Sequence, residues 1–188
     1  MKTMLSMAIV LLSLSACKKD KDAPMPTTVV RESIGVQYDK NLGNKTVNWF
    51  SADKMSGLSM PQISQDNSLH GGILFGYYLN GTEYGLYSPE TFPVVYGQEN
   101  WIKKQSVTFR KSAMSQAEMQ AIFQKDLTPA DVINLWNKGV NPGKTITHPH
   151  EGEFYLFRTA DQLITGVLAV TTISGTLETM FAEVWIAK

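Results

Sequence analysis

Cysteine is almost absent from this chain of 188 residues, which contains a single one, at position 17. One cysteine excludes an intramolecular disulfide, the usual support of small exported domains. An excess of charge is also lacking, because 17 basic residues balance 17 acidic ones. This balance excludes the electrostatic footprint of a nucleic-acid-binding protein, and it offers no basic patch for anionic lipid head groups.

A hydrophobic run long enough to span a bilayer is missing at the N-terminus. The apolar stretch from Met4 to Ala16 falls short of the roughly 20 residues that a membrane-spanning helix needs. It follows the positively charged Lys2 and ends in small residues, which is typical of a secretory signal. We therefore expect residues 1–16 to be a signal peptide that is removed from the mature protein.

The end of this segment reads Leu14-Ser15-Ala16-Cys17. It resembles the lipobox of bacterial lipoproteins, in which an aliphatic residue and two small residues precede an obligatory cysteine. The resemblance implies cleavage before Cys17, a thioether-linked diacylglycerol on its sulfur, and a third acyl chain, often palmitate, on the new amine. Two or more acyl chains hold a protein stably on a membrane. The alternative is an ordinary signal peptide with an unrelated cysteine.

The residues after Cys17 are charged and then proline-containing, with no apolar periodicity. Such a composition favours disorder, so residues 17–28 are expected to be the lipidated cysteine and a flexible tether. A cysteine followed by lysine and aspartate is similar to small lipoproteins of the Bacteroidota. That resemblance implies a place in the bacterial cell envelope, in the outer membrane, with the side it faces, periplasm or cell surface, left open.

Residues 29–188 have the length and hydrophobic content of one globular domain. Apolar and polar residues alternate over 29–38 and 104–110, which predicts half-buried strands. Asn80-Gly81 between two apolar runs predicts a hairpin. Residues 52–70 read as a loop, either without helix or with one helical turn. At the end of the chain, 163–173 is apolar on both faces and 177–187 alternates again.

Two short helices are expected in the middle of the domain. Ser115 and Glu118 form a capping-box pattern, and Thr128-Pro129 starts a second helix that Gly139 ends. The sequence thus predicts a mainly β fold, an antiparallel β-sandwich with two short helices inserted before the C-terminal hairpin. The closing run after Phe157-Arg158-Thr159 is similar to uncharacterised Bacteroidota lipoproteins, and this resemblance implies no activity.

His148 and His150 are the weak candidates for a metal site. In an extended segment both side chains point the same way, so they could offer two nitrogens to Zn²⁺, with an oxygen from Glu151 or Glu153. A third ligand is required, and His70 is the other histidine of the chain. The competing interpretation is an exposed loop that contains two histidines, and we expect no cofactor.

Signatures of common enzymes are missing as well. There is no Gly-x-Ser-x-Gly motif, and Cys17 is expected to carry lipid, so no cysteine nucleophile remains. The segment 139–145 has one residue too few between its glycines for a phosphate-binding loop, and it follows a helix. Glu151 and Glu153 could act as paired carboxylates, and the competing interpretation is that they lie in a solvated loop or edge. No catalytic residue is assigned.

Aromatic residues gather between positions 75 and 101. They either fill the core of the sandwich or stack on a ligand such as a sugar or a protein partner. Tyr96 and Trp101, in a loop that contains Gly and Asn, are the ones we expect to be exposed, and they are the candidate ligand-binding residues.

Three functions follow from these patterns, in order of preference. The first is a membrane-anchored lipoprotein with a non-catalytic binding or accessory domain for a glycan or a protein. The second is an envelope hydrolase acting on glycans or peptides. The third is a structural envelope protein.

Overall fold

The computed structural model describes residues 24–38, 46–95, 97–174 and 178–188. The expected signal peptide, Cys17 and Tyr96 lie outside these ranges. Within them the chain is mainly β, and every pair of neighbouring strands is antiparallel. The predicted mainly β fold with an antiparallel sandwich is therefore confirmed.

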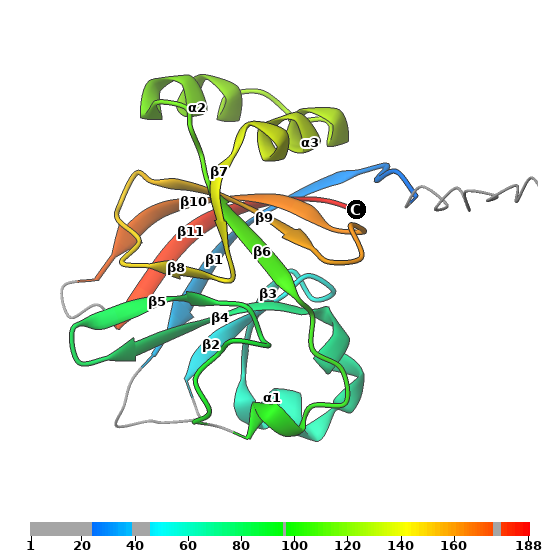
Figure 1. The fold of residues 1–188 in the computed structure, drawn as a ribbon, viewed down its shortest axis with the longest axis vertical. Coiled ribbons are helices and arrows are strands. Elements are labelled where there is room, and N and C mark those ends of the chain that lie inside the picture. Colours follow the sequence, from blue (N-terminus) through cyan, green and yellow to red (C-terminus); the bar gives the residue numbers. More distant parts are fainter. Residues whose placement is uncertain (1–23, 39–45, 96, 175–177) are drawn as a thin grey trace, which may run out of the picture.

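Two sheets face each other (Figure 1). Sheet A has the order β1-β11-β10-β9-β6-β7, and sheet B has the order β3-β2-β4-β5-β8. The strands of sheet A are β1 (Val29–Gln37), β6 (Val107–Lys111), β7 (Val140–Gly143), β9 (Phe154–Thr159), β10 (Thr165–Ile173) and β11 (Thr179–Ala187). Those of sheet B are β2 (Val47–Ser51), β3 (Ser56–Ser59), β4 (Ile73–Asn80), β5 (Glu83–Tyr87) and β8 (Thr145–Thr147).

Successive side chains of β11 alternate between two apolar clusters, one on each face of sheet A. Met180, Ala182, Val184 and Ile186 enter the core between the sheets, as the sequence predicts. Trp185, on the other face, belongs to a second cluster beneath the helices. Because β11 and its neighbour β10 are covered on both faces, both strands need apolar residues on each side. This explains the nearly continuous apolar run of β10.

Helices α2 (Gln116–Phe123) and α3 (Pro129–Lys138) cover the outer face of sheet A (Figure 1). Both predicted starts are confirmed, because Ser115 and Thr128 each form a complete capping box. Gly139 is the C-cap of α3, also as predicted. Val132, Leu135 and Trp136 turn the apolar side of α3 toward β9 and β10.

The outer face of sheet B carries a further layer, made of α1 (Met60–Gln65), a 3-10 helix η2 (Asn67–Gly72) and the segment 88–106. The prediction of a loop over 52–70 is wrong at β3, which pairs with β2. The short helix α1 is of the kind that the sequence allowed in this segment. Leu58, Met60 and Ile63 are buried in this layer. Pairing across the sheet and burial decided the structure, and neither has a clear local signal.

The chain passes from sheet A to sheet B through β7 and β8. The sequence predicts a helix stop and a Pro-Gly turn over 139–145, and the two strands were missed. β7 pairs with β6 in sheet A, and β8 pairs with β5 in sheet B. The asparagine, proline and glycine of this segment hide its strand character, which the neighbouring strands impose.

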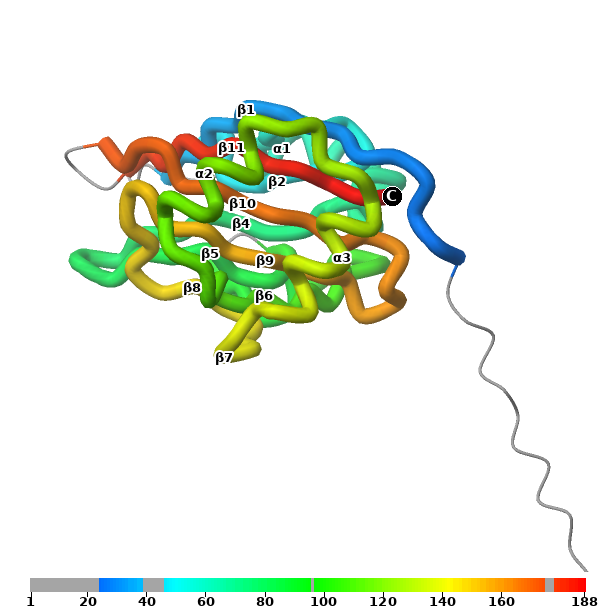
Figure 2. Tube along the Cα trace, turned by 90° about the horizontal axis from the view of Figure 1, so that it is seen from above, coloured from blue at the N-terminus to red at the C-terminus, as the bar shows by residue number. Residues whose placement is uncertain are grey.

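The two ends of the described domain lie together. The amides of Thr27 and Thr28 both donate to the carbonyl of Lys188, at 3.1 and 3.2 Å. The last two residues of the expected tether are thus bound to the domain. Figure 2 shows Pro24 at one end of the domain, beside the C-terminus. In the described part of the chain, no helix combines the length and the apolar character that crossing a membrane requires.

Candidate functional site: a cleft beside β7 and β8

A cleft of about 350 Å³ opens at the side of the sandwich where the chain crosses between the sheets. Phe109, Ile146 and Tyr155 form its floor and belong to the core between the sheets. The rim is polar and is contributed by β6, β7, β8 and the loop before β9. The rim residues are Arg110, Lys111, Asn141, Thr145, Thr147, His148, His150 and Glu153. A partly apolar hollow with a few converging polar groups is the usual form of a small-ligand site.

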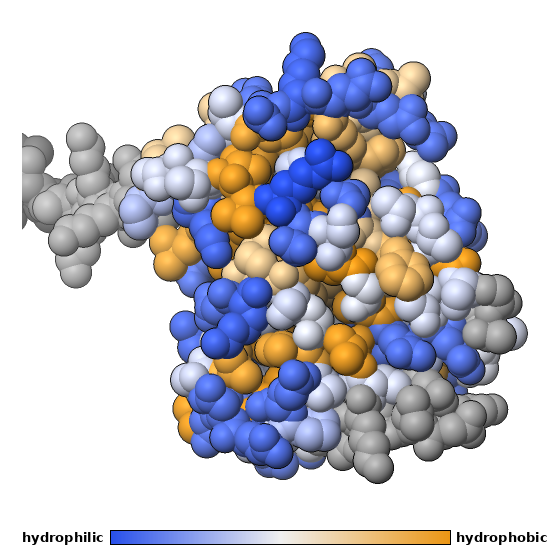
Figure 3. All heavy atoms as spheres, turned by 180° about the vertical axis from the view of Figure 1, so that it is seen from behind, coloured by the Kyte–Doolittle hydropathy of each residue, from blue (hydrophilic) through white to orange (hydrophobic). Residues whose placement is uncertain are grey.

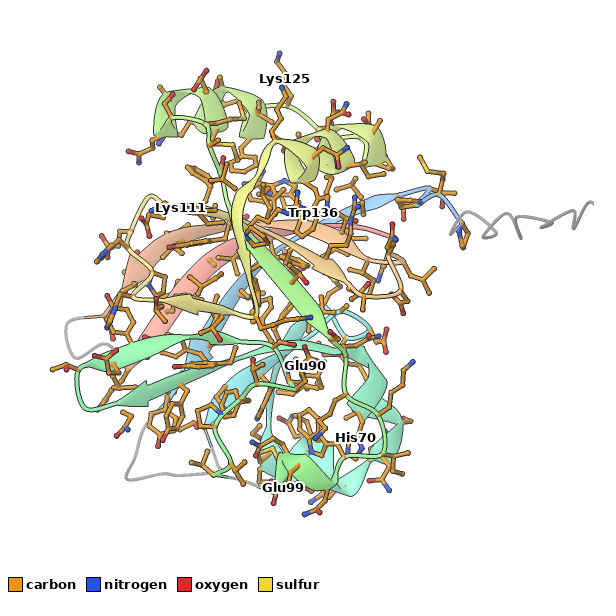
Figure 4. The ribbon with its side chains drawn as sticks, in the orientation of Figure 1. His70, Glu90, Glu99, Lys111, Lys125 and Trp136 are labelled. Atoms are coloured by element: carbon orange, nitrogen blue, oxygen red, sulfur yellow. The ribbon has the colours of Figure 1, made fainter. Side chains whose placement is uncertain are left out.

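Glu153 holds the charged part of the rim together. Its Oε1 accepts from Lys111 Nζ at 2.5 Å, and Lys111 lies at the end of β6 (Figure 4). Its Oε2 accepts from the amide of His150 at 2.9 Å and from the hydroxyl of Tyr155. Two elements and a loop are thereby fixed by one carboxylate.

The protonation of this group follows from its partners. Burial raises the pKa of Glu153, but the hydrogen bonds from Lys111, Tyr155 and the His150 amide outweigh it and leave the pKa below its ordinary value. Burial, followed by the hydrogen bond to Glu153, raises the pKa of the Tyr155 phenol. At neutral pH the pair is therefore an ionised carboxylate and a neutral phenol. A carboxylate stabilised in this way can bind a ligand or position neighbouring groups, and it is poorly suited to donating a proton.

His148 adopts a left-handed backbone conformation, with φ of 48°. Its amide donates to the carbonyl of Tyr84, and its Nε2 lies 3.2 Å from Glu83 Oε2. The positive φ ends β8 and turns the His148 ring toward β5. The extended geometry that would align His148 and His150 toward one metal ion is absent, although both residues line the cleft.

Comparison with known proteins identifies a similar fold. A solved structure matches this chain with a TM-score of 0.60: the crystal structure of a DUF4466 family protein from Parabacteroides merdae. The two chains are 12% identical, and the match covers 86% of this chain but 54% of the other. At this identity the likeness shows the fold alone. The present chain spans about half the length of that protein. No protein-family description and no curated protein matches the sequence.

The histidines do not converge on one metal site. Within the described ranges, no group of three or more His, Cys, Asp or Glu side chains is close enough to hold an ion. His70, considered as a third ligand, lies in η2, in the layer on the outer face of sheet B that also contains α1 (Figure 4). There its Nδ1 accepts from the amide of Ile102 at 3.3 Å, and its ring stacks on Trp101.

The two neighbouring glutamates also separate. Glu153 lies in the cleft, whereas Glu151 accepts from the amide of Ile173 at 2.9 Å and lines a groove on the outer face of sheet A. The loop turns between them at Gly152, which has φ of 79°. The paired carboxylates that glycoside hydrolysis would use are therefore not formed by these two residues.

The prediction that Trp101 is exposed is wrong. Its side chain is 8% exposed, and its ring centroid lies 4.8 Å from that of Trp49 and 5.2 Å from that of His70. The segment 88–106 covers sheet B and uses Trp101 as its anchor in the third apolar cluster. Trp101 is consequently a core residue. Tyr96, the other candidate, lies outside the described residues.

Most residues of the cleft carry no signal in the sequence. Lys111, Asn141 and Tyr155 carried no motif, because they come from three strands that meet only in the folded chain. The one usable signal was the polar stretch from His148 to Glu153, which contributes His148, His150 and Glu153 to the rim.

Proposed function

We propose that this chain is a lipoprotein anchored through Cys17, and that its domain is a non-catalytic binding module. The anchoring proposal rests on Leu14-Ser15-Ala16-Cys17 and on the charged segment that follows it. The expected location is the bacterial envelope, with the outer membrane preferred. The acyl chains carry the attachment in this proposal.

We assign the ligand to the cleft beside β7 and β8, and its class to glycans. The observation that carries this assignment is the cleft's combination of an apolar floor with hydrogen-bond donors and acceptors on its rim. Asn141 and Thr147 offer both kinds of group, and the Lys111–Glu153 pair adds charged ones. Sugars present hydroxyl groups around an apolar ring face, so this arrangement fits one sugar residue.

The preference for binding over hydrolysis also has a physical reason. A hydrolase acting on glycans needs one carboxyl group that is protonated near neutral pH. Glu153 is held ionised by three donors, and Glu151 points to another surface. Detection of sugar cleavage by the purified domain would reverse this preference.

The anchor is tested on the native polypeptide. Intact mass should show loss of residues 1–16 and the added mass of acyl chains at Cys17. The variant Cys17→Ser should leave the membrane fraction. An unmodified thiol at position 17, or unchanged membrane partition of the variant, would refute the anchoring proposal.

The cleft is tested by profiling the mature chain on a glycan array, followed by calorimetric titration of any glycan that binds. The variant Asn141→Ala should weaken binding about fivefold, because a lost hydrogen bond to ligand costs on the order of 1 kcal/mol. Asn134→Ala is the matched control, since Asn134 lies on α3 away from the cleft. Binding unaffected by Asn141→Ala, or no binding to any glycan, would contradict the assignment.

A further inference from the structure

A second hollow lies at the end of the domain from which the N-terminal segment leaves. It has a volume of about 350 Å³ and is lined by Pro24–Pro26, Ile133, Arg158, Gln162 and Thr165. It thus combines the start of the described chain, helix α3 and the turn between β9 and β10. None of these residues contributes to the cleft beside β7 and β8.

Arg158 supplies the charge in this hollow. Its guanidinium carbon lies 5.0 Å from the centroid of the Trp136 ring, and that of Arg110 lies 4.2 Å from it (Figure 4). Arg110 is bound to the α3 backbone, because its Nη1 donates to the carbonyl of Trp136. Arg158 Nε donates to Thr165 Oγ1 at 2.9 Å. The rest of the Arg158 guanidinium is therefore available along the wall of the hollow.

The two arginines carry positive charge that the described residues do not neutralise. The ion pairs of the described chain involve Arg31, Lys111, Lys144 and His148, but neither Arg110 nor Arg158. The nearby Asp161 accepts from the amide of Leu163 within its own turn. Burial and then repulsion by Arg110 lower the pKa of Arg158, although the group stays charged. An anion beside Arg158 would relieve this repulsion.

The position of the hollow limits what can reach it. Residues 17–23 span at most about 25 Å when fully extended, so the hollow lies within that distance of Cys17. Two apolar side chains near it are exposed, with fractions of 71% for Met25 and 44% for Leu163. Figure 3 shows hydrophobic side chains at the surface close to where the N-terminal segment leaves the domain.

We propose that this end of the domain docks on the membrane, with the phosphate group of an anionic lipid bound at Arg158 and with Met25 and Leu163 against the interface. The proposal rests on the anchoring at Cys17. Guanidinium groups bind phosphate oxygens through paired hydrogen bonds, and Gln162 and Thr165 add neutral donors. The exposed apolar side chains add an apolar contact with the membrane interface, which free phosphate cannot provide.

Docking in this way orients the binding cleft. The loop from His148 to Glu153, on the rim of the cleft, lies at the opposite end of the domain from Pro24 in both Figures 1 and 2. The cleft then faces away from the membrane, where a glycan can enter it.

The test uses the mature chain, residues 17–188, coupled through the Cys17 thiol to a maleimide lipid in vesicles. All described elements lie after residue 23, so coupling at Cys17 leaves them intact. Hydrogen exchange is compared on vesicles of phosphatidylcholine alone and on vesicles that also contain phosphatidylglycerol. We expect the amides of 160–164 to exchange about fivefold more slowly on the anionic vesicles, the gain typical of one cation near such a surface.

Variants locate the contact. Arg158→Gln and Met25→Ser should each remove most of the protection, and Arg158→Lys should retain part of it. The matched controls are Lys103→Gln and Ile102→Ser, which remove the same charge and a similarly exposed apolar group from the segment over sheet B. Since Met25 is exposed, its replacement tests the proposal even where Arg158→Gln disturbs packing on Trp136.

Each outcome decides the proposal. Equal exchange on both vesicles, or protection that survives both Arg158→Gln and Met25→Ser, overturns it. Protection produced equally by inorganic phosphate without vesicles assigns the site to a free anion and overturns the membrane contact. Because the anchor is chemical in this experiment, the result does not depend on processing of the lipobox, which intact mass tests separately.

Discussion

Glu153 illustrates how much one side chain can organise in this protein. Its two carboxylate oxygens take donors from β6, from β9 and from the loop between β8 and β9. The residue stands before β9 in a loop that the sequence presents as polar and solvated. Its role comes from Lys111, which is 42 positions away along the chain.

Replacement of Glu153 by Gln should lower the free energy of unfolding by about 1 kcal/mol at neutral pH, because the pair with Lys111 is partly exposed. The pKa of Glu153 is lowered in the folded state, so its contribution is present above the ordinary glutamate pKa and is lost as pH falls through the lowered folded value. Urea unfolding at about pH 7 and about pH 2 measures this.

The expected result is a difference between wild type and Glu153→Gln that shrinks in acid. Glu32→Gln, at an exposed position of β1, should show a small difference at both pH values. A constant difference across the pH range would mean that the ionised carboxylate is not the stabilising species.

A second prediction for a single residue concerns Trp101. Trp101→Ala should cost about 3 kcal/mol of stability, because a buried ring between Trp49 and His70 is replaced by a cavity. The adjacent Ile102 is 79% exposed, and Ile102→Ala should change stability by less than about 0.5 kcal/mol. Chemical denaturation followed by circular dichroism compares the two. Equal effects would place Trp101 at the surface.

At the scale of elements, the short strand β8 decides whether the cleft exists. It pairs with β5 through Thr145, Ile146 and Thr147, and it brings Ile146 into the floor. Gly85 allows this pairing, because a Cβ atom there would lie 2.3 Å from the carbonyl oxygen of Ile146. The glycine is required by the close approach of two backbones.

Gly85→Ala should therefore separate β8 from β5. We expect faster hydrogen exchange at Thr145 and Thr147 and a stability loss of about 1–3 kcal/mol. The control is Gly143→Ala, since its Cβ would make only an ordinary contact of 3.6 Å with the oxygen of Thr145. Slow exchange at β8 in Gly85→Ala would show that the strand shifts to accommodate the methyl group and that the glycine is dispensable.

For the whole molecule, the arrangement of four layers separates two functional ends. The sandwich lies between the helices α2 and α3 on one side and α1 with the segment 88–106 on the other (Figure 1). These layers cover the outer faces of the two sheets, and the proposed contacts lie at the ends of the sheets. The proposed membrane contact lies at the end with Pro24, and the rim loop of the cleft lies at the other.

Orientation on the membrane can be measured as a distance. A fluorescent amino acid at Leu163 should transfer energy to acceptor-labelled lipids about twofold or more efficiently than one at Val140. Leu163 lies in the turn between β9 and β10, at the end from which the N-terminal segment leaves, whereas Val140 begins β7, farther from that end (Figure 1). The two side chains are matched controls for each other, with exposed fractions of 44% and 43%. Equal transfer from both positions on anchored chains would exclude a fixed orientation.

Some features of this protein depend on neighbouring residues alone, and the sequence determined those. The capping boxes at Ser115 and Thr128 and the hairpin after Asn80 are set by hydrogen bonds and turn geometry within a few residues. The alternation of β11 likewise specifies which residues enter the core. From such local rules the mainly β sandwich with its two central helices could be predicted.

Other features exist only because distant segments meet, and the tertiary structure decided those. β3, β7 and β8 form by pairing with neighbouring strands, although the residues of β3 and β7 favour turns. Trp101 is buried because its loop crosses sheet B, and the cleft collects side chains from separate strands. The physical reason is that burial and strand pairing are long-range, whereas propensity and capping act within one turn of the chain.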